Sequence, residues 1–232
     1  MAFLLHPSGS LQYHLRAWRW RRTLWAPFHA EVRRWLTYWR PDSSHLVLIG
    51  PSAGYALTAQ FLSRFPRISV LEPDPLARWL LRRRFPGAAF DWQDSECLPQ
   101  PGGFARLAAA FPDAAFLFCN LLGQELQGQP VRFDRAAWLA ELEPALAGRS
   151  WASWHDLVST ARAPDSHEPV RLDRAIPRDE LLAQFWHGGR LEISDHETAG
   201  LCPQSPRQYG IWHLAPRRYH LIEWLATQRP CS

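Results

Sequence analysis

The chain of 232 residues contains no lysine, so all 26 of its basic side chains other than histidine are arginine. Its 22 acidic residues are interspersed along the sequence, and the net charge at pH 7 is only +4. Outside the N-terminal region no sustained basic run marks a surface for phosphate groups. Arginine without lysine indicates a bacterial-type, GC-rich genome, and we do not expect nucleic acid as a partner.

Cysteine and long hydrophobic runs are also scarce. The four cysteines are far apart and form no CxxC pair, which excludes a zinc knuckle and a redox motif: Cys97, Cys119, Cys202 and Cys231. No segment approaches the roughly 20 apolar residues of a membrane span. The apolar run near the N-terminus has four residues, too short for a signal peptide. We therefore expect a cytoplasmic protein without a membrane span.

Hydrophobic residues, at 47%, and aromatic residues, at 13%, are sufficient for a large core. Residues 1–43 are rich in tryptophan and arginine at helical spacings and predict an N-terminal helical extension, followed by one domain over residues 44–232. The cluster WRWRR at 18–22 is open to two interpretations. It is either a surface for membrane, RNA, another protein or self-association, or a helix that packs its tryptophan face on the domain.

From residue 44 the chain alternates short apolar runs with helical patterns, which is typical of a parallel sheet. Together with the last strands, it predicts an α/β, Rossmann-like three-layer sandwich with a mostly parallel seven-stranded sheet. We expect strands at residues 45–49, 68–72, 88–91, 114–119, 150–156, 190–196 and 209–214. We expect helices at residues 55–65, 75–85, 104–111, 135–146, 177–187 and 217–227.

The most informative motif is LVLIGPSAGYAL at residues 46–57, an apolar strand that enters a turn of small residues. Such a turn lets the backbone approach a ligand, and free N–H groups at a helix start favour an electron-rich partner. The next strand ends at Glu72, 18 residues after Gly54. A carboxylate there can accept hydrogen bonds from both ribose hydroxyls of a nucleoside.

With these motifs the chain resembles the class I S-adenosylmethionine-dependent methyltransferases over roughly residues 44–214. The resemblance implies S-adenosylmethionine as cofactor and a methyl acceptor that is a small molecule or a protein. It departs from the usual pattern at Leu48, where an acid is common, and at Ser52, where a glycine is common. The cofactor-binding residues it implies are Gly50, Pro51, Ser52, Gly54, Glu72, Asp94 and Asn120.

Two residues at the predicted end of the fifth strand, His155 and Asp156, are our candidates for the catalytic base. Neighbouring strand residues point to opposite faces, so we expect only one of them to face the substrate cleft. Asn120 is followed by two leucines, which speaks against the tetrad of nucleic-acid and glutamine methylases. Three consecutive residues rarely converge on one ion, so we expect no metal at Asp195, His196 and Glu197.

Two other classes stay open. Residues 50–54 read G-x-S-x-G, the nucleophile elbow of serine hydrolases, with Asp156 and several histidines downstream of Ser52. Only 51 residues precede this serine, however, whereas that fold needs several strands before it. The altered glycine signature also suits a methyltransferase-like domain that has lost catalysis and serves as a binding or assembly partner.

Overall fold

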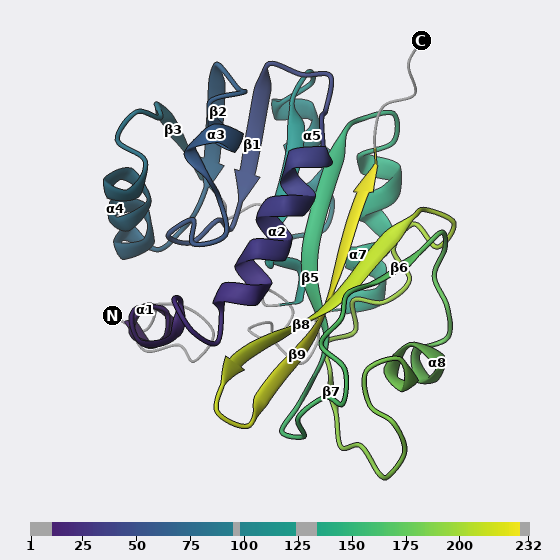
Figure 1. The fold of residues 1–232 in the computed structure, drawn as a ribbon. Coiled ribbons are helices and arrows are strands. Elements are labelled where there is room, and N and C mark those ends of the chain that lie inside the picture. Colours follow the sequence, from purple (N-terminus) through teal and green to yellow (C-terminus); the bar gives the residue numbers. More distant parts are fainter. Residues whose placement is uncertain (1–10, 95–97, 124–133, 228–232) are drawn as a thin grey trace.

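The computed structural model describes residues 11–94, 98–123 and 134–227. Within them nine strands form one sheet in the order β3-β2-β1-β4-β5-β9-β8-β6, and β7 pairs with β5 (Figure 1). The first five strands are parallel, and β1 and β4 are buried hydrophobic runs because helices cover both faces. They are β1 (His45–Ile49), β2 (Arg67–Leu71), β3 (Phe90–Gln93), β4 (Ala115–Cys119) and β5 (Trp151–Thr160).

The remaining strands are antiparallel. The long strand β9 (Arg218–Thr227) lies between β5 and β8 (Arg207–Ala215) and pairs with both. Two short strands complete the sheet, β6 (Val170–Leu172) beside β8 and β7 (Ser194–Asp195) beside β5. A parallel sheet of this order that ends in an inserted antiparallel strand confirms the predicted Rossmann-like fold.

Helices form a layer on each face of the parallel strands, as predicted for a three-layer sandwich. One face packs against α1 (Leu11–Trp20), α2 (Ala26–Tyr38), α3 (Ala59–Leu62) and α4 (Pro75–Arg84). The other packs against α5 (Gly103–Ala110) and α7 (Arg135–Ala145). In Figure 1, α2 crosses in front of the sheet, and α5 and α7 lie behind it. The short α8 (Arg178–Ala183) covers the antiparallel strands.

Three sequence predictions of secondary structure are wrong. Residues 217–227 form β9 rather than a helix, because pairing on both sides, with β5 and β8, overrides a pattern that is ambiguous for a buried apolar run. The predicted strand at residues 190–196 is reduced to the two residues of β7. With β9 and the short β6 added, the sheet has nine strands rather than seven.

The predicted helix at residues 55–65 is also largely absent. Residues 55–58 turn instead, and α3 has only four residues. Its start is set by Thr58, whose side-chain oxygen accepts a hydrogen bond from the Phe61 amide at 3.1 Å. The other predicted strands and helices are present, with bounds that differ by a few residues or, for the 177–187 helix, by a shorter span.

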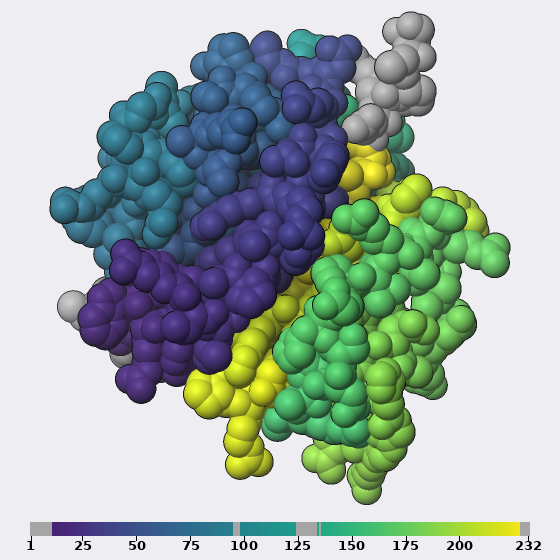
Figure 2. Space-filling view, in the orientation of Figure 1, coloured from purple at the N-terminus to yellow at the C-terminus, as the bar shows by residue number. Residues whose placement is uncertain are grey.

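The N-terminal helices share the core of the sheet. Trp25, fully buried, donates a hydrogen bond from its indole N–H to the Leu214 carbonyl at 2.8 Å and packs edge-on against Trp212. Phe28 stacks on the same Trp212 ring with a centroid distance of 4.8 Å. Figure 2 shows the purple N-terminal segment lying across the molecule between the blue and the yellow residues. The packing interpretation of the tryptophan-rich segment is therefore correct for Trp25.

Not every tryptophan of this N-terminal segment is buried. Trp18 is 75% exposed on α1, so the WRWRR cluster presents one tryptophan to solvent, while Trp25, at the N-cap of the following helix, is buried. Along the described parts of the chain, none of the helices combines the length and the apolar character that crossing a bilayer requires. The division into residues 1–43 and 44–232 stays a prediction.

We expect Trp25→Ala to lower the free energy of unfolding by about 3–5 kcal/mol, because it removes a fully buried indole and leaves the Leu214 carbonyl without its donor. Urea unfolding followed by circular dichroism measures this change. Trp18→Ala is the matched control and should change stability by no more than about 0.5 kcal/mol. Equal stability of the two variants would show that the extension does not contribute to the folded core.

Candidate active site

The carboxyl ends of the parallel strands bring most of the predicted residues to one edge of the sheet. The loop after β1 contains two glycines in the left-handed region, Gly50 at φ +64° and Gly54 at φ +63°. A Cβ on Gly54 would lie 2.5 Å from Leu81 and 2.8 Å from Phe85, so α4 packs too closely for any larger residue. A Cβ on Gly50 would lie 2.8 Å from the Leu121 side chain. Packing therefore requires glycine at both positions.

The backbone amides of this loop donate hydrogen bonds within the protein, which differs from the prediction. We predicted free N–H groups at a helix start, but four amides between residues 50 and 57 have partners inside the protein. The Gly50 amide donates to the Leu71 carbonyl at 2.9 Å, and the Gly54 and Leu57 amides donate within the loop. Ser52, with a positive φ of 50°, donates its amide to Glu72. α3 begins only at Ala59, so residues 50–57 precede that helix and do not form its start.

Glu72 follows β2 and joins two loops. Its carboxylate accepts hydrogen bonds from the Ser52 amide at 2.8 Å and from the Asp74 amide at 3.1 Å. The side chain is only 6% exposed, and this burial raises the pKa of Glu72 to about 7 in spite of the two amides and of Arg78. The structure therefore places the predicted ribose-binding acid at the carboxyl edge, next to the predicted glycine loop.

The two remaining cofactor predictions differ in environment. Asp94 follows β3 and is exposed, beside residues that lie outside the described part of the chain. Asn120 follows β4 with a positive φ of 56° and is buried. Its side chain donates to the Asp156 carboxylate at 3.3 Å and accepts from the Asp156 amide at 3.1 Å. Asn120 therefore positions Asp156 rather than only closing a turn.

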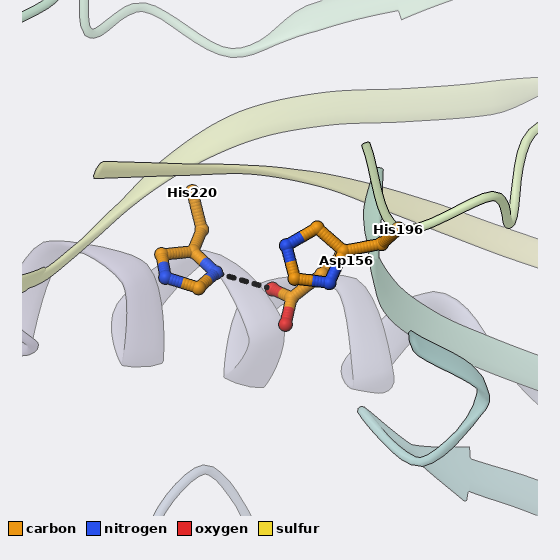
Figure 3. A group of neighbouring side chains, drawn as sticks. All are labelled: Asp156, His196 and His220. Carbon is orange, nitrogen blue, oxygen red and sulfur yellow. Dashed lines mark ion pairs between the residues drawn. The ribbon is translucent and has the colours of Figure 1, made fainter. Parts of the chain in front are cut away.

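Asp156 lies in a buried group with His196 and His220, shown in Figure 3. The ring nitrogen Nδ1 of His220 is 3.1 Å from Oδ1 of Asp156. Burial alone raises the pKa of Asp156, but His220, His196 and the Asn120 amide lower it below its ordinary value. The carboxylate is therefore charged at neutral pH, and it lies within β5, two residues beyond the last residue that pairs with β4.

Sequence reasoning missed both histidines of this group. His220 was placed in a helix, whereas β9 aligns it with Ser159 on β5. His196 was considered only as one of several histidines for a serine hydrolase and, with its neighbours Asp195 and Glu197, as a metal ligand. Asp195 instead pairs with Arg178 at the surface. β9 is buried along six consecutive residues rather than on alternate ones, so no period-two pattern in the sequence marked His220 as part of a strand.

The three side chains could also offer ligand atoms to a metal ion, since one from each lies within 4.8 Å of the others. Contacts within the protein engage His196 and one side of the His220 ring, whereas the buried Nε2 of His220 has no hydrogen-bond partner among the described residues. The His196 ring is 3.2 Å from the Ser159 hydroxyl and is hydrogen-bonded to the Gly123 backbone. The spacing of His220 and Asp156 is that of a direct acid–imidazole pair. An acid–imidazole pair therefore describes the contact between Asp156 and His220, and the group keeps a geometry that could hold a metal ion.

His155, the other predicted base, has a separate environment. Its Nδ1 is 3.0 Å from the Ser153 hydroxyl, and its Nε2 is 3.1 Å from the Glu223 carboxylate. Glu223 also accepts a hydrogen bond from Arg207 at 2.7 Å, and all three ionisable side chains are buried. Burial alone raises the pKa of Glu223, but His155 and Arg207 lower it below its ordinary value. Adjacent strand residues point to opposite faces, so His155 points away from the Asp156 group.

The helix α1 lies over this edge, at the end toward which the arrows of β1 and β2 point (Figure 1). His14 is 3.0 Å from the Tyr55 hydroxyl and 3.4 Å from the Asp74 carboxylate, so α1 contacts the loops after β1 and β2. The pKa of Tyr13 is raised by burial and by the nearby charges of Tyr55, Glu72 and Asp156. These two residues were not among the predicted site residues.

The Ser52 hydroxyl has no hydrogen bond to a histidine among the described residues, although the serine-hydrolase interpretation needs one. The only described contact of Ser52 in this region is its amide bond to Glu72. Its positive φ reflects the turn between β1 and α3.

Comparison with known proteins gives two results. No protein-family profile and no curated protein sequence matches this chain. Among solved structures, it is similar to the N-methyltransferase NodS from Bradyrhizobium japonicum WM9 in complex with S-adenosyl-L-homocysteine, with a TM-score of 0.46 and 12% identity over 87% of this chain and 86% of that one.

Two other solved structures of methyltransferases are also similar to this chain. A SAM-dependent methyltransferase from Anabaena variabilis has a TM-score of 0.44 and 17% identity, over 83% of this chain and 79% of that one. CalS10, an amino pentose methyltransferase from Micromonospora echinaspora with bound SAM, has a TM-score of 0.38 and 17% identity, over 96% and 82%. The strand order of the sheet, rather than these similarities, identifies the fold.

We expect Arg207→Ala to destabilise the protein by about 3–5 kcal/mol, because it leaves the buried Glu223 carboxylate without its strongest partner. Chemical unfolding at pH 7 measures this change. Arg178→Ala removes the exposed pair with Asp195 and should cost less than about 1 kcal/mol. If the two variants were equally stable, the His155 group would not be a structural ion-pair network.

Proposed function

We propose that this protein is an S-adenosylmethionine-dependent methyltransferase whose acceptor is a small molecule or a protein. The observation that carries the proposal is the Glu72 carboxylate. It is buried at the carboxyl end of β2, in contact with the loop after β1, in a sheet of Rossmann-like order. In such sheets, ligands bind outside the carboxyl ends of the strands, where the strand order reverses.

The residues of this edge fit the cofactor in three respects. Each Glu72 oxygen has one backbone donor, so each still has a lone pair that can accept a ribose hydroxyl. Gly50 and Gly54 let the loop after β1 take the positive φ angles of its turn beside Glu72. Asp94 and Asn120 follow the next two strands toward the same edge. We propose that Gly50, Pro51, Ser52, Gly54, Glu72, Asp94 and Asn120 bind the cofactor.

When bound, the cofactor supplies a methyl group on a sulfonium, which a nucleophile can attack in line. The chain's own contribution is to position the acceptor and to accept its proton. Asp156 is suited to this task because its carboxylate is charged at neutral pH and is oriented by Asn120 and His220. His155 takes no part in this step, since its ring is engaged with Ser153 and Glu223.

A second candidate is a methyltransferase-like partner protein without catalysis. It is favoured by one observation: the loop amides and the Glu72 oxygens already have partners within the chain, and α1 contacts the loops on either side of them. Such an edge is stable without a ligand. The two candidates differ in whether S-adenosylmethionine or S-adenosylhomocysteine binds at all.

We expect calorimetric titration with S-adenosylhomocysteine to show binding to the unmodified protein and a loss of at least tenfold in affinity for Glu72→Ala. The variant removes the acceptor of the ribose hydroxyls. Glu180→Ala changes an exposed acid on α8 and is the control, which should bind as the unmodified protein does. Absence of heat with either cofactor form would overturn the activity and favour the partner protein.

The raised pKa of Glu72 also predicts a pH dependence. The ionised carboxylate is the better acceptor, and a group with a pKa of about 7 is mostly protonated at pH 6 and mostly ionised at pH 8. The affinity for S-adenosylhomocysteine should therefore rise about tenfold from pH 6 to pH 8. In Glu72→Gln this rise should disappear, because the amide does not titrate. A rise of the same size in both proteins would assign it to another group.

A further inference from the structure

A cavity of about 400 Å³ opens on the helical side of the molecule, at a place that the methyltransferase proposal does not use. Three segments far apart in the sequence meet there: the N-terminal helices, the loop after β1, and the last residue of α4. Four of the lining residues are arginines, and the cavity contains no acidic side chain. The polar and charged side chains that line the cavity are Arg21, Arg22, His29, Arg33, Tyr55 and Arg84.

Two of the guanidinium groups are fixed on the backbone of the loop after β1. Arg33 donates from Nη2 to the Tyr55 carbonyl at 2.9 Å, and Arg84 donates from Nε to the Ala53 carbonyl at 3.0 Å. The Arg84 guanidinium also lies 4.7 Å from the centre of the Tyr55 ring. Side chains fixed in this way lose less conformational entropy when a ligand binds, and their other N–H donors remain available.

The charge of the four arginines is not neutralised by a neighbour. In the described parts of the chain, none of the four forms an ion pair with a carboxylate, although arginines elsewhere do, for example Arg34 with Glu31. His29 cannot add to the charge at neutral pH. Burial, followed by the charges of Arg33 and Arg84, lowers the pKa of His29 to about 3. The cavity is therefore a concentration of positive charge carried by guanidinium groups alone.

We propose that this cavity binds a small phosphate-bearing ligand. Guanidinium groups match the oxygens of a phosphate in pairs, and several arginines around one concave site are the usual means of holding a multiply charged oxyanion. The volume accommodates a group of that size, whereas an extended nucleic acid would need a basic stripe along the surface. The proposal holds whether or not the chain transfers methyl groups, since none of the residues that line the cavity is among the proposed cofactor-binding or catalytic residues.

Calorimetric titration with pyrophosphate, at fixed pH and ionic strength, tests the proposal. We expect binding to the unmodified protein and a loss of at least tenfold in affinity for the double variant Arg22→Gln, Arg84→Gln. The control is Arg19→Gln, Arg83→Gln. It removes the same charge from neighbouring exposed positions outside the cavity and should bind within about twofold of the unmodified protein. No binding, or equal losses in both variants, would overturn the proposal.

A second measurement needs no variant, so a folding defect cannot obscure it. Phenylglyoxal modifies accessible guanidinium groups, and peptide mapping follows each arginine. Pyrophosphate should slow the modification of Arg22 and Arg84 severalfold and leave Arg19 and Arg83 unchanged. Uniform protection, or none, contradicts a cavity site. Phosphate and phenyl phosphate, titrated in the same way, distinguish a free ion from the phosphate of a larger molecule, and both responses must disappear in the cavity variant.

Discussion

The position of β9 between β5 and β8 is the constraint on which the rest of the molecule depends. Nine of the ten residues of β5 pair with β9, with Glu223 opposite His155 and, beyond a one-residue register shift between Asp156 and Val158, His220 opposite Ser159. This pairing supplies partners to both faces of β5, a histidine for Asp156 on one face and a carboxylate for His155 on the other. A slip of one residue would exchange the faces and leave charged groups buried among apolar ones.

The two faces of β5 show how similar residues acquire different roles. His155 is enclosed with Glu223 and Arg207, and both oxygens of that carboxylate have cationic or imidazole partners. Asp156 has an asparagine and a histidine instead, and it lies on β5 beside the end of the parallel strand β4. A fully partnered buried network specifies a packing arrangement, whereas a charged group at the strand ends can meet a ligand. The residue types alone do not separate these cases.

Because residue types alone do not reveal tertiary contacts, only part of the fold and of the candidate site was predictable from the sequence. The parallel half of the sheet was predictable, because each buried strand is a short apolar run followed by a helical pattern, and Glu72 and Asn120 follow strands directly. In the antiparallel half β8 was predicted and β9 was not. β9 is buried on both faces, and its partner β5 lies 58 or more residues away in the sequence, so no local pattern marked it as a strand. His196 and His220 enter the site only through that tertiary pairing. The helix after Gly54 failed for a local reason, the cap at Thr58.

Tyr55 links the edge of the sheet to the arginine-lined cavity. In a dinucleotide-binding turn its position would hold the third glycine, and its bulk excludes that packing. Here each part of the residue has a different contact: the hydroxyl with His14 on α1, the carbonyl with Arg33 on α2, and the ring with Arg84 on α4. The loop after β1 is therefore held by side chains from three helices. An anion that neutralises Arg33 and Arg84 would reduce their mutual repulsion and so favour this same loop conformation.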